Sequence, residues 1–456
     1  MKDFSAAYLP SIARRCKTLK KRCSNIRATN FWSNLLDRDT TINENALNYH
    51  EYPRPGKIAT CITKPFATQG DLSLAYTPGV AAPCLEIEKN PDDAYRYTSK
   101  GNLVGVISNG TAVLGLGNIG ALASKPVMEG KAILFKKFSD LDAYDIEVDE
   151  TDIERFCDAV AAIAPTFGGI NLEDIKAPEC FEIERRLVER LDIPVMHDDQ
   201  HGTAVISLAA VTNGCLLTNR ELKDIKLVIV GAGAAALSCA RLYRHAGVRN
   251  IFMTDSKGVI HAGRDDLNNY KKEFMAPDGT TFDQIFNNAD VVIGLSKPGS
   301  FSIENIMLME NDPIIFTLAN PTPEIFPENT RMARPDAILA TGRSDFPNQV
   351  NNVLGFPFIF RGAMDVRAKT INMEMKVAAS MALAALARAE VPEYLNEIYG
   401  TKLVFGKEYI IPKPFDKRLI VEVSSSVAQA AVASGVARIE SFDLETYKHE
   451  LAQRLE

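Results

Sequence analysis

The residues with the clearest capacity for chemistry are two adjacent carboxylates, Asp198 and Asp199. The apolar stretch 193–195 before them is typical of a short strand, and a helix is predicted to start at Ala204. Both carboxylates are therefore expected at a strand-to-helix turn, where side chains can converge on a ligand. A solvated turn acid or a helix-capping acid is the simpler interpretation of such a pair taken alone.

A second acidic pair, Glu173 and Asp174, follows a Gly-rich stretch upstream. Four carboxylates gathered in one place repel one another unless a cation lies among them. Mg²⁺ and Mn²⁺ prefer oxygen ligands, so either ion suits such a cluster. Because both pairs accompany a nucleotide-binding motif, the sequence favours a divalent metal site over two unrelated turns.

The nucleotide-binding motif is Gly231-x-Gly233-x-x-Ala236, which follows the apolar segment 226–230 and opens an apolar helix. The first glycine permits a tight turn, the second lets the backbone approach a pyrophosphate, and the small third residue lets helix and strand pack closely. The helix N-terminus offers free N–H groups to the phosphates. The residues expected to contact the dinucleotide are Gly231, Ala232, Gly233, Ala234 and Ala235.

Asp255, at the end of the next predicted strand, bears on the choice of coenzyme. Its carboxylate would accept hydrogen bonds from an adenosine ribose and favour NAD. Lys257, two residues further on, would instead pair with a 2′-phosphate and admit NADP. A turn acid before Gly258 is the simpler interpretation of Asp255. The sequence leaves NAD and NADP equally open.

Length and composition indicate a water-soluble globular protein of two or three domains. The chain has 456 residues, of which 46% are hydrophobic and 24% charged. No apolar run approaches the roughly 20 residues that a membrane span needs. Eight cysteines without a CxxC pair indicate a reducing compartment rather than a disulfide framework. The net charge is −7, but outside residues 1–36 the chain has 43 basic and 57 acidic side chains, and this acidic body argues against a nucleic-acid partner.

Residues 1–44 form a basic leader that is excluded from the fold prediction. Residues 1–36 hold eight Lys and Arg side chains and one acid, Asp3. This composition suits an organellar transit peptide, a disordered basic arm, or an upstream start codon chosen for a bacterial protein. We expect a cytoplasmic protein, with a mitochondrial-type organelle as the alternative if the leader is a transit peptide.

The second half of the chain alternates strands with helices, and each strand runs into a polar loop. This pattern predicts a doubly wound parallel sheet of the Rossmann type, covered by Ala-rich helices. The expected strands are 103–107, 193–195, 226–230, 250–254, 291–293, 314–316 and 337–339. The expected helices include 40–52, 152–164, 180–191, 234–245, 373–389 and 421–437.

Two further side chains are candidate proton carriers. Tyr76 is expected in an extended or loop segment, because it lies just before the Pro78-Gly79 turn. A helix starting at Pro126 would carry Lys131, whose pKa a neighbouring metal and nicotinamide would lower. From spacing alone, a solvated lysine and a half-buried aromatic are the simpler interpretations.

Seven segments of the chain resemble successive motifs of malic enzymes, most closely those of the bacterial type. They are Gln69–Val80, Gly110–Lys131, Asn171–Glu184, His197–Ala204, Gly231–Ala236, Ala319–Glu324 and Thr341–Gly362. The resemblance implies an α/β protein with an N-terminal α/β substrate domain over 45–200. A Rossmann-like NAD(P)-binding domain with C-terminal covering helices is then expected over 201–456.

The resemblance also implies roles for individual residues. Tyr76 corresponds to the proton donor of the family and Lys131 to its general base. Asp198 corresponds to a second active-site carboxylate that supports Lys131. The implied metal ligands are Glu173, Asp174 and Asp199, and the implied substrate and nicotinamide contacts are Asn320 and Asn352, with Asn351 as a substitute for Asn352.

The implied activity is oxidative decarboxylation of malate to pyruvate and CO₂, with NAD or NADP and with Mg²⁺ or Mn²⁺. A homo-oligomer, a dimer or larger, is expected. Since the sequence ends at Glu456, we also expect no phosphotransacetylase-like domain, into which many bacterial relatives continue. The alternatives are a metal-dependent oxaloacetate decarboxylase and a non-catalytic dinucleotide-binding regulator.

Overall fold

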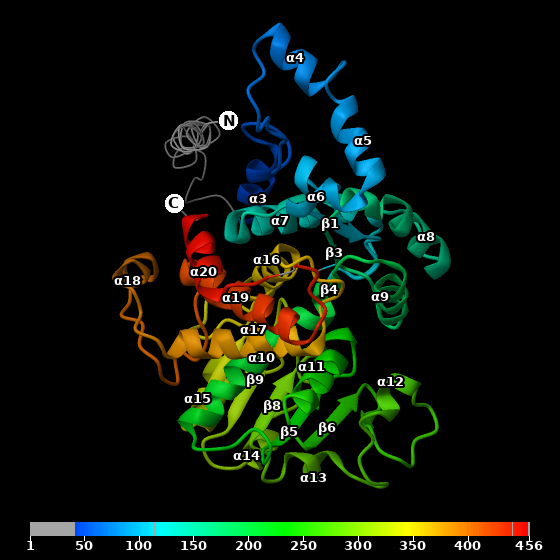
Figure 1. The fold of residues 1–456 in the computed structure, drawn as a ribbon. Helices are drawn as coiled ribbons and strands as arrows, with labels where there is room; N and C mark the ends of the chain where they lie inside the picture. The colour runs from blue at the N-terminus through cyan, green and yellow to red at the C-terminus, as the bar shows by residue number, and fades with distance from the viewer. Residues whose placement is uncertain (1–41, 114, 440, 455–456) are drawn as a thin grey trace. The chain divides into compact units, whose positions relative to one another are not determined.

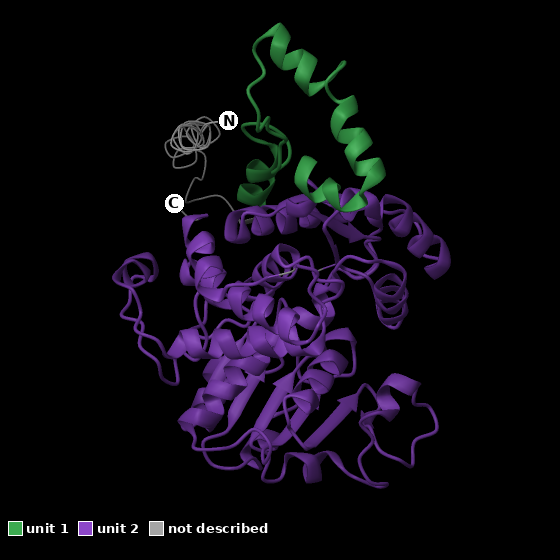
Figure 2. Ribbon diagram, in the orientation of Figure 1, with its two compact units in different colours: residues 1–98 green, residues 99–456 purple. Residues whose placement is uncertain are grey.

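The computed structural model describes residues 42–113, 115–439 and 441–454. Most of the basic leader predicted over residues 1–44 lies outside the described residues, and its three interpretations stay open. Contacts along the chain divide it into two compact units, which Figure 2 colours separately.

The first unit, residues 1–98, consists of helices and loops in its described part. None of the residues 43–98 is buried. The helix expected over 40–52 is present, and Tyr76 follows the second helix as its C-terminal cap. The helices are α3 (Ile42–Glu51), α4 (Gln69–Ala75), α5 (Ala81–Lys89), η1 (Pro91–Asp93) and α6 (Ala94–Tyr97).

The second unit, residues 99–456, begins with a four-stranded parallel sheet in the order β2-β1-β3-β4. The sequence predicted β1 and the start of β4 but neither of the other strands. The third strand was missed because the segment is Gly-rich, and the second because it carries three acids. The strands are β1 (Leu103–Ser108), β2 (Asp142–Glu147), β3 (Gly169–Leu172) and β4 (Val195–His197).

The helix that carries Lys131 is longer than the sequence predicted. It is α7 (Ala121–Ser139), which begins five residues before the expected start and contains Pro126 in its interior. Proline costs a helix one N–H donor. Here Ala132 and Phe135 of the same helix are buried in the core, and this packing offsets the missing bond.

The second sheet of this unit confirms the predicted Rossmann-like architecture. Its order is β10-β9-β8-β5-β6-β7, and all pairs are parallel except the short β6–β7 pair. Figure 1 labels the central strands β9, β8, β5 and β6. The strands are β5 (Lys226–Val230), β6 (Asn250–Asp255), β7 (Gly258–Val259), β8 (Val291–Gly294), β9 (Ile314–Thr317) and β10 (Ile338–Thr341).

Helix α10 (Asp198–Leu217) connects the last strand of the first sheet to the first strand of the second. Of its 20 residues, 14 are buried, so it is a core helix rather than a surface one. It begins at Asp198, six residues before the predicted Ala204. Asp198 and Asp199 therefore lie in its first turn, where the helix dipole favours negative charge.

The two predicted Ala-rich helices are present as α17 (Met373–Arg388) and α19 (Arg418–Ala433), although the second starts three residues before the expected 421. The first packs on α10, and the second packs on the first and on α16 (Phe356–Asp365). The larger helices are α8 (Ile153–Ile163), α9 (Glu179–Arg190), α11 (Ala234–His245), α16 (Phe356–Asp365), α17 (Met373–Arg388), α19 (Arg418–Ala433) and α20 (Leu444–Gln453). The shorter ones are η2 (Lys100–Asn102), η3 (Ala164–Thr166), α12 (Asn269–Lys272), α13 (Phe282–Phe286), α14 (Ile303–Met307), α15 (Pro327–Ala333), η4 (Asn352–Leu354) and α18 (Glu393–Tyr399). Over the described residues, no helix combines the length and apolarity that crossing a membrane requires.

The contact between α16 and α19 depends on a glycine. A Cβ at Gly362 would lie 2.4 Å from the carbonyl oxygen of Ser424 and 2.9 Å from Cβ of Val427. We expect Gly362→Ala to lower the free energy of unfolding by about 1–3 kcal/mol, because the two helices must separate. Urea unfolding measures this change. Gly406→Ala is the matched control, since its nearest atom is 3.9 Å away, and equal effects would contradict the argument.

Candidate active site

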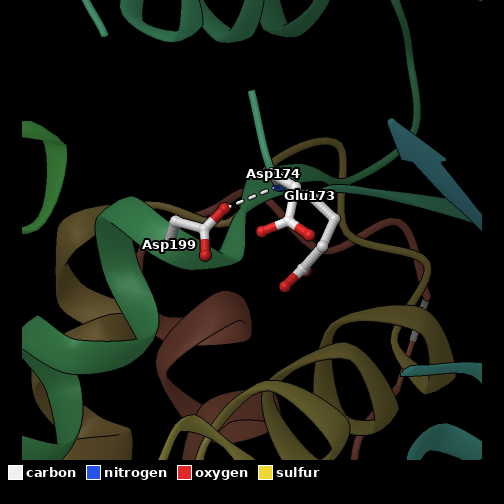
Figure 3. Close-up of side chains that lie close together, drawn as sticks. All are labelled: Glu173, Asp174 and Asp199. Atoms are coloured by element: carbon white, nitrogen blue, oxygen red, sulfur yellow. Dashed lines mark hydrogen bonds between the residues drawn. The ribbon is translucent and has the colours of Figure 1, made fainter. Parts of the chain in front are cut away.

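The two acidic pairs meet because β3 and β4 are adjacent and parallel. Leu172 pairs with His197 in the register, so the residues that follow each strand leave the sheet at the same edge. The metal-ligand atoms offered by Glu173, Asp174 and Asp199 all lie within 4.8 Å of one another (Figure 3). The structure thus brings together the three residues that the resemblance assigned to a metal.

Backbone and side-chain hydrogen bonds hold this cluster in place. The Asp174 N–H donates to Asp199 Oδ2 at 2.7 Å, the bond drawn in Figure 3. The side chain of Asn171 donates to Glu173 Oε2 at 2.8 Å. Asp174 has a φ of 53°, in the left-handed region that non-glycine residues seldom adopt. Such strain is typical of functional sites.

Lys131 of α7 lies beside the cluster. Its Nζ is 2.8 Å from Glu173 Oε1 and 2.7 Å from Asp198 Oδ2, and it lies 4.2 Å from the ring centroid of Phe356. Burial alone would lower the pKa of Lys131, but the two carboxylates outweigh burial and raise it. The sequence had suggested the opposite direction, because it did not place both carboxylates against the ammonium.

Asp198 is fully buried and links Lys131 to η4. The Asn352 side-chain amide donates to Asp198 Oδ2 at 3.2 Å, and the Thr203 hydroxyl donates to Asn352 Oδ1 at 3.1 Å. Gly202 is required for this approach, since a Cβ there would lie 2.3 Å from Asp198 Oδ1. Sequence reasoning missed Thr203 and Gly202, although both belong to the acidic motif.

The remaining amide candidates lie in two loops. Asn351 caps η4, where its side chain accepts from the Val353 N–H at 3.0 Å. Asn320 follows β9, and a Cβ at Gly342 would come within 2.7 Å of its Nδ2. Roles for Asn320 and Asn352 in binding substrate or nicotinamide stay predictions.

The cluster has the donor set that a hard divalent cation requires. Three carboxylates from two adjacent strand ends offer oxygens, and Glu173 and Asp174 are only 5% and 3% exposed. Carboxylates this deeply buried need a compensating charge, and Lys131 supplies one positive charge against four carboxylates. A bound Mg²⁺ or Mn²⁺ would complete the balance.

The glycine motif forms the predicted tight turn between β5 and α11. Gly231 has a φ of 128°, and a Cβ there would lie 2.4 Å from the carbonyl oxygen of Leu295. A Cβ at Gly233 would meet no atom within 4 Å, so this backbone borders open space. Ala234 opens α11, and the loop therefore fits a pyrophosphate held against a helix N-terminus.

Asp255 lies at the end of β6, as predicted, but its carboxylate is already paired. Arg264 donates to both its oxygens at 2.8 and 3.0 Å, and Lys271 lies 2.6 Å from Oδ2. Burial would raise the pKa of Asp255, but these two cations lower it to about 2. Lys257, the expected phosphate partner, pairs with Asp266 at 2.8 Å. Arg264 and Lys271 were not foreseen, because they lie on a loop and a short helix beyond the strand.

Tyr76 belongs to the first unit, where it is 68% exposed. It follows α4, whose N-terminus carries a capping box formed by Thr68 and Asp71. Its role as proton donor stays a prediction.

A partly buried polar cluster next to Asp198 and Asp199 also escaped the sequence analysis. Glu184 of α9 bonds to the ring of His201, and His201 bonds to Ser238 of α11. Burial would raise the pKa of Glu184, but His201 and Lys376 lower it to about 2, so the carboxylate is ionised at neutral pH. The spacing of His197 and His201, four residues apart, was the only signal in the sequence.

Comparison with known proteins now assigns the class. The family model for the malic enzyme N-terminal domain matches residues 55–152 and 149–188, and the model for the malic enzyme NAD-binding domain matches 200–400. These matches cover more than half of the chain. The chain therefore belongs to the malic enzyme family, as the resemblance indicated.

Individual relatives agree with this assignment. A probable NADP-dependent malic enzyme of Rickettsia prowazekii is 60% identical over 415 residues, which cover 90% of this chain and 54% of that protein. An NADP-dependent malic enzyme of Halomonas elongata is 57% identical over 397 residues, covering 86% and 94%. The crystal structure of a malic enzyme from Pyrococcus horikoshii superposes with a TM-score of 0.83 at 42% identity, covering 91% and 96%.

The chain spans about half the length of several curated relatives that it matches, 54–56% for three of them. Both NADP-dependent and NAD-dependent enzymes occur among its relatives, and a NAD-binding domain is present.

The cluster geometry predicts a specific loss of metal affinity. We expect Asp199→Asn to weaken Mn²⁺ binding by at least about 10–100-fold, the cost of losing even an outer-shell partner, because one anionic ligand disappears. Electron paramagnetic resonance of free Mn²⁺ gives the dissociation constant. Asp192→Asn, an acid whose side chain is 88% exposed, is the control and should bind Mn²⁺ normally. Unchanged affinity in Asp199→Asn would remove Asp199 from the ligand set.

Proposed function

We propose that this protein catalyses the oxidative decarboxylation of malate to pyruvate and CO₂, with reduction of NAD or NADP and with Mg²⁺ or Mn²⁺. The observation that carries the proposal is the position of Lys131. It lies between Asp198 and Glu173, beside three convergent carboxylates, in a member of the malic enzyme family.

The three carboxylates Glu173, Asp174 and Asp199 would hold the divalent cation, and the loop 231–235 would hold the dinucleotide. The cation would supply Lewis-acid polarisation of the C2 oxygen of malate, and the dinucleotide would supply the hydride acceptor for C2. The chain's own residues must then bind and orient the substrate and move two protons.

Lys131 would take the proton of the C2 hydroxyl as a neutral amine, because a cation held by Glu173 and Asp199 would offset the carboxylates that raise the lysine pKa. Asp198 holds the lysine Nζ at 2.7 Å and so keeps it oriented before and after the proton moves. Asn352, which bonds to Asp198, would present its amide to the substrate beside Lys131. Asn320 is the second candidate contact for substrate and nicotinamide.

Tyr76 would donate a proton to C3 after CO₂ has left. Its phenol can serve as a proton donor, since tyrosine is a recognised general acid. The support for this role is its position in the Gln69–Val80 segment that resembles the family motif.

We also propose that the protein acts as a homo-oligomer, with functional domains over 45–200 and 201–456. Support for association comes from the first unit, which exposes large apolar side chains in its described part. They include Leu47, Ile62, Phe66, Leu74 and Tyr76. A cytoplasmic location is supported by the six free cysteines of the described residues.

The proposed activity is tested by absorbance at 340 nm with malate, Mn²⁺ and each nucleotide in turn. We expect NAD(P)H and pyruvate to appear together in equal amounts. Pyruvate from oxaloacetate without any NAD(P)H signal from malate would favour a metal-dependent decarboxylase. Nucleotide binding without turnover would favour a non-catalytic regulator.

Removing either proton carrier should slow turnover while sparing coenzyme binding. We expect Lys131→Ala and Tyr76→Phe each to lower kcat by about 10²–10⁴-fold, the usual contribution of general acid–base catalysis. Lys136→Ala on the same helix and Tyr97→Phe in the same unit are matched controls that should retain parental kcat. Parental kcat in either test variant would overturn the role assigned to that residue.

A further inference from the structure

His201 is a partly buried histidine whose two ring nitrogens contact two different helices. It lies in the first turn of α10, two residues after Asp199. Its Nε2 is 2.9 Å from Oε1 and 3.0 Å from Oε2 of Glu184, on α9. Its Nδ1 is 3.0 Å from the hydroxyl of Ser238, on α11. One imidazole therefore joins three helices.

Glu184 holds both sides of the acidic turn. Besides contacting His201, its carboxylate accepts a hydrogen bond from the His197 N–H at 2.8 Å. His197 is the last residue of β4, and His201 lies in the first turn of α10. Asp198 and Asp199 therefore lie between two residues that both bond to the Glu184 side chain. A partly buried, ionised carboxylate with such partners is a rigid anchor.

Ser238, the other partner of His201, belongs to the helix that follows the proposed pyrophosphate loop. It is buried on α11, five residues after Gly233, at which the proposed pyrophosphate loop ends. A dinucleotide bound at the N-terminus of α11 would restrict that helix. The restriction would reach the acidic turn through one side chain, because Ser238 and Glu184 are bonded to the two nitrogens of the same ring.

We propose that His201 is a positioning residue that couples the dinucleotide site to the divalent-cation site, so that nucleotide binding tightens cation binding. The proposal rests on the function proposed above for both sites. Coupling of this kind is reciprocal, so the cation must tighten nucleotide binding by the same factor. His201 itself contacts neither ligand in this scheme.

The test measures cation binding rather than turnover. Mn²⁺ is titrated into the full chain with and without saturating NADP, or NAD if that is the active coenzyme, and free Mn²⁺ is followed by electron paramagnetic resonance. We expect nucleotide to lower the Mn²⁺ dissociation constant of the parental protein by at least about fivefold. In Ser238→Ala this ratio should fall to near one, while the dissociation constant without nucleotide stays parental.

Two further variants separate coupling from general loosening. Ser207→Ala removes another buried hydroxyl between the same helices, since Ser207 of α10 lies 3.7 Å from the thiol of Cys239 on α11. It should keep the parental ratio. His201→Gln keeps a donor for Glu184 but cannot also reach Ser238, so it should lose the ratio and carries the test if Ser238→Ala fails to fold.

The proposal would be overturned if nucleotide left the Mn²⁺ dissociation constant of the parental protein unchanged. It would also be overturned if Ser238→Ala or His201→Gln showed the same nucleotide effect as the parental protein. An equal loss of the ratio in Ser207→Ala would overturn it as well, because helix packing would then explain the effect. Absence of malate turnover in the parental protein would sink the proposed function instead, and the binding ratio would still be measurable.

Discussion

Four carboxylates meet at one edge of the first sheet, and their mutual repulsion is the constraint on which the rest of the second unit depends. Buried acids this close raise one another's cost of ionisation unless positive charge lies among them. Lys131 supplies one such charge from α7, at 2.8 Å from Glu173 and 2.7 Å from Asp198. The surrounding helices hold that ammonium in place, and the cluster keeps an excess of negative charge that a bound cation would offset.

The pattern of alternation was enough to predict the Rossmann-like sheet, since β5, β6, β8 and β9 are apolar runs with turn signals after them. The first sheet was harder to predict. Its third strand begins with a glycine and is only four residues long, so tertiary pairing rather than propensity makes it a strand. The start of α10 was placed too late, because paired acids and a glycine hide a helical first turn.

The site residues were predictable where the chemistry requires a particular side chain. They were less predictable where a residue is required because another part of the chain packs closely against it. Paired carboxylates that suit a hard cation can be recognised in the sequence. The need for glycine at 202 is not evident from the sequence, because it arises from the orientation of the Asp198 side chain and from Asn352, 150 positions away in the chain. Asp255 shows the same limit, since its partners Arg264 and Lys271 come from a loop and a helix that no local pattern connects to β6.

The position of helix α10 limits which substitutions its sequence can accept during evolution. Its first turn presents Asp198 and Asp199 to the cluster, while its later turns form the spine on which α11 and α17 pack. The same helix therefore carries two acids of the cluster and a large part of the core. A larger side chain on its buried face would press on α11 or α17 and shift the end that carries Asp198 and Asp199, so changes in this core are constrained by the acidic cluster as well as by folding.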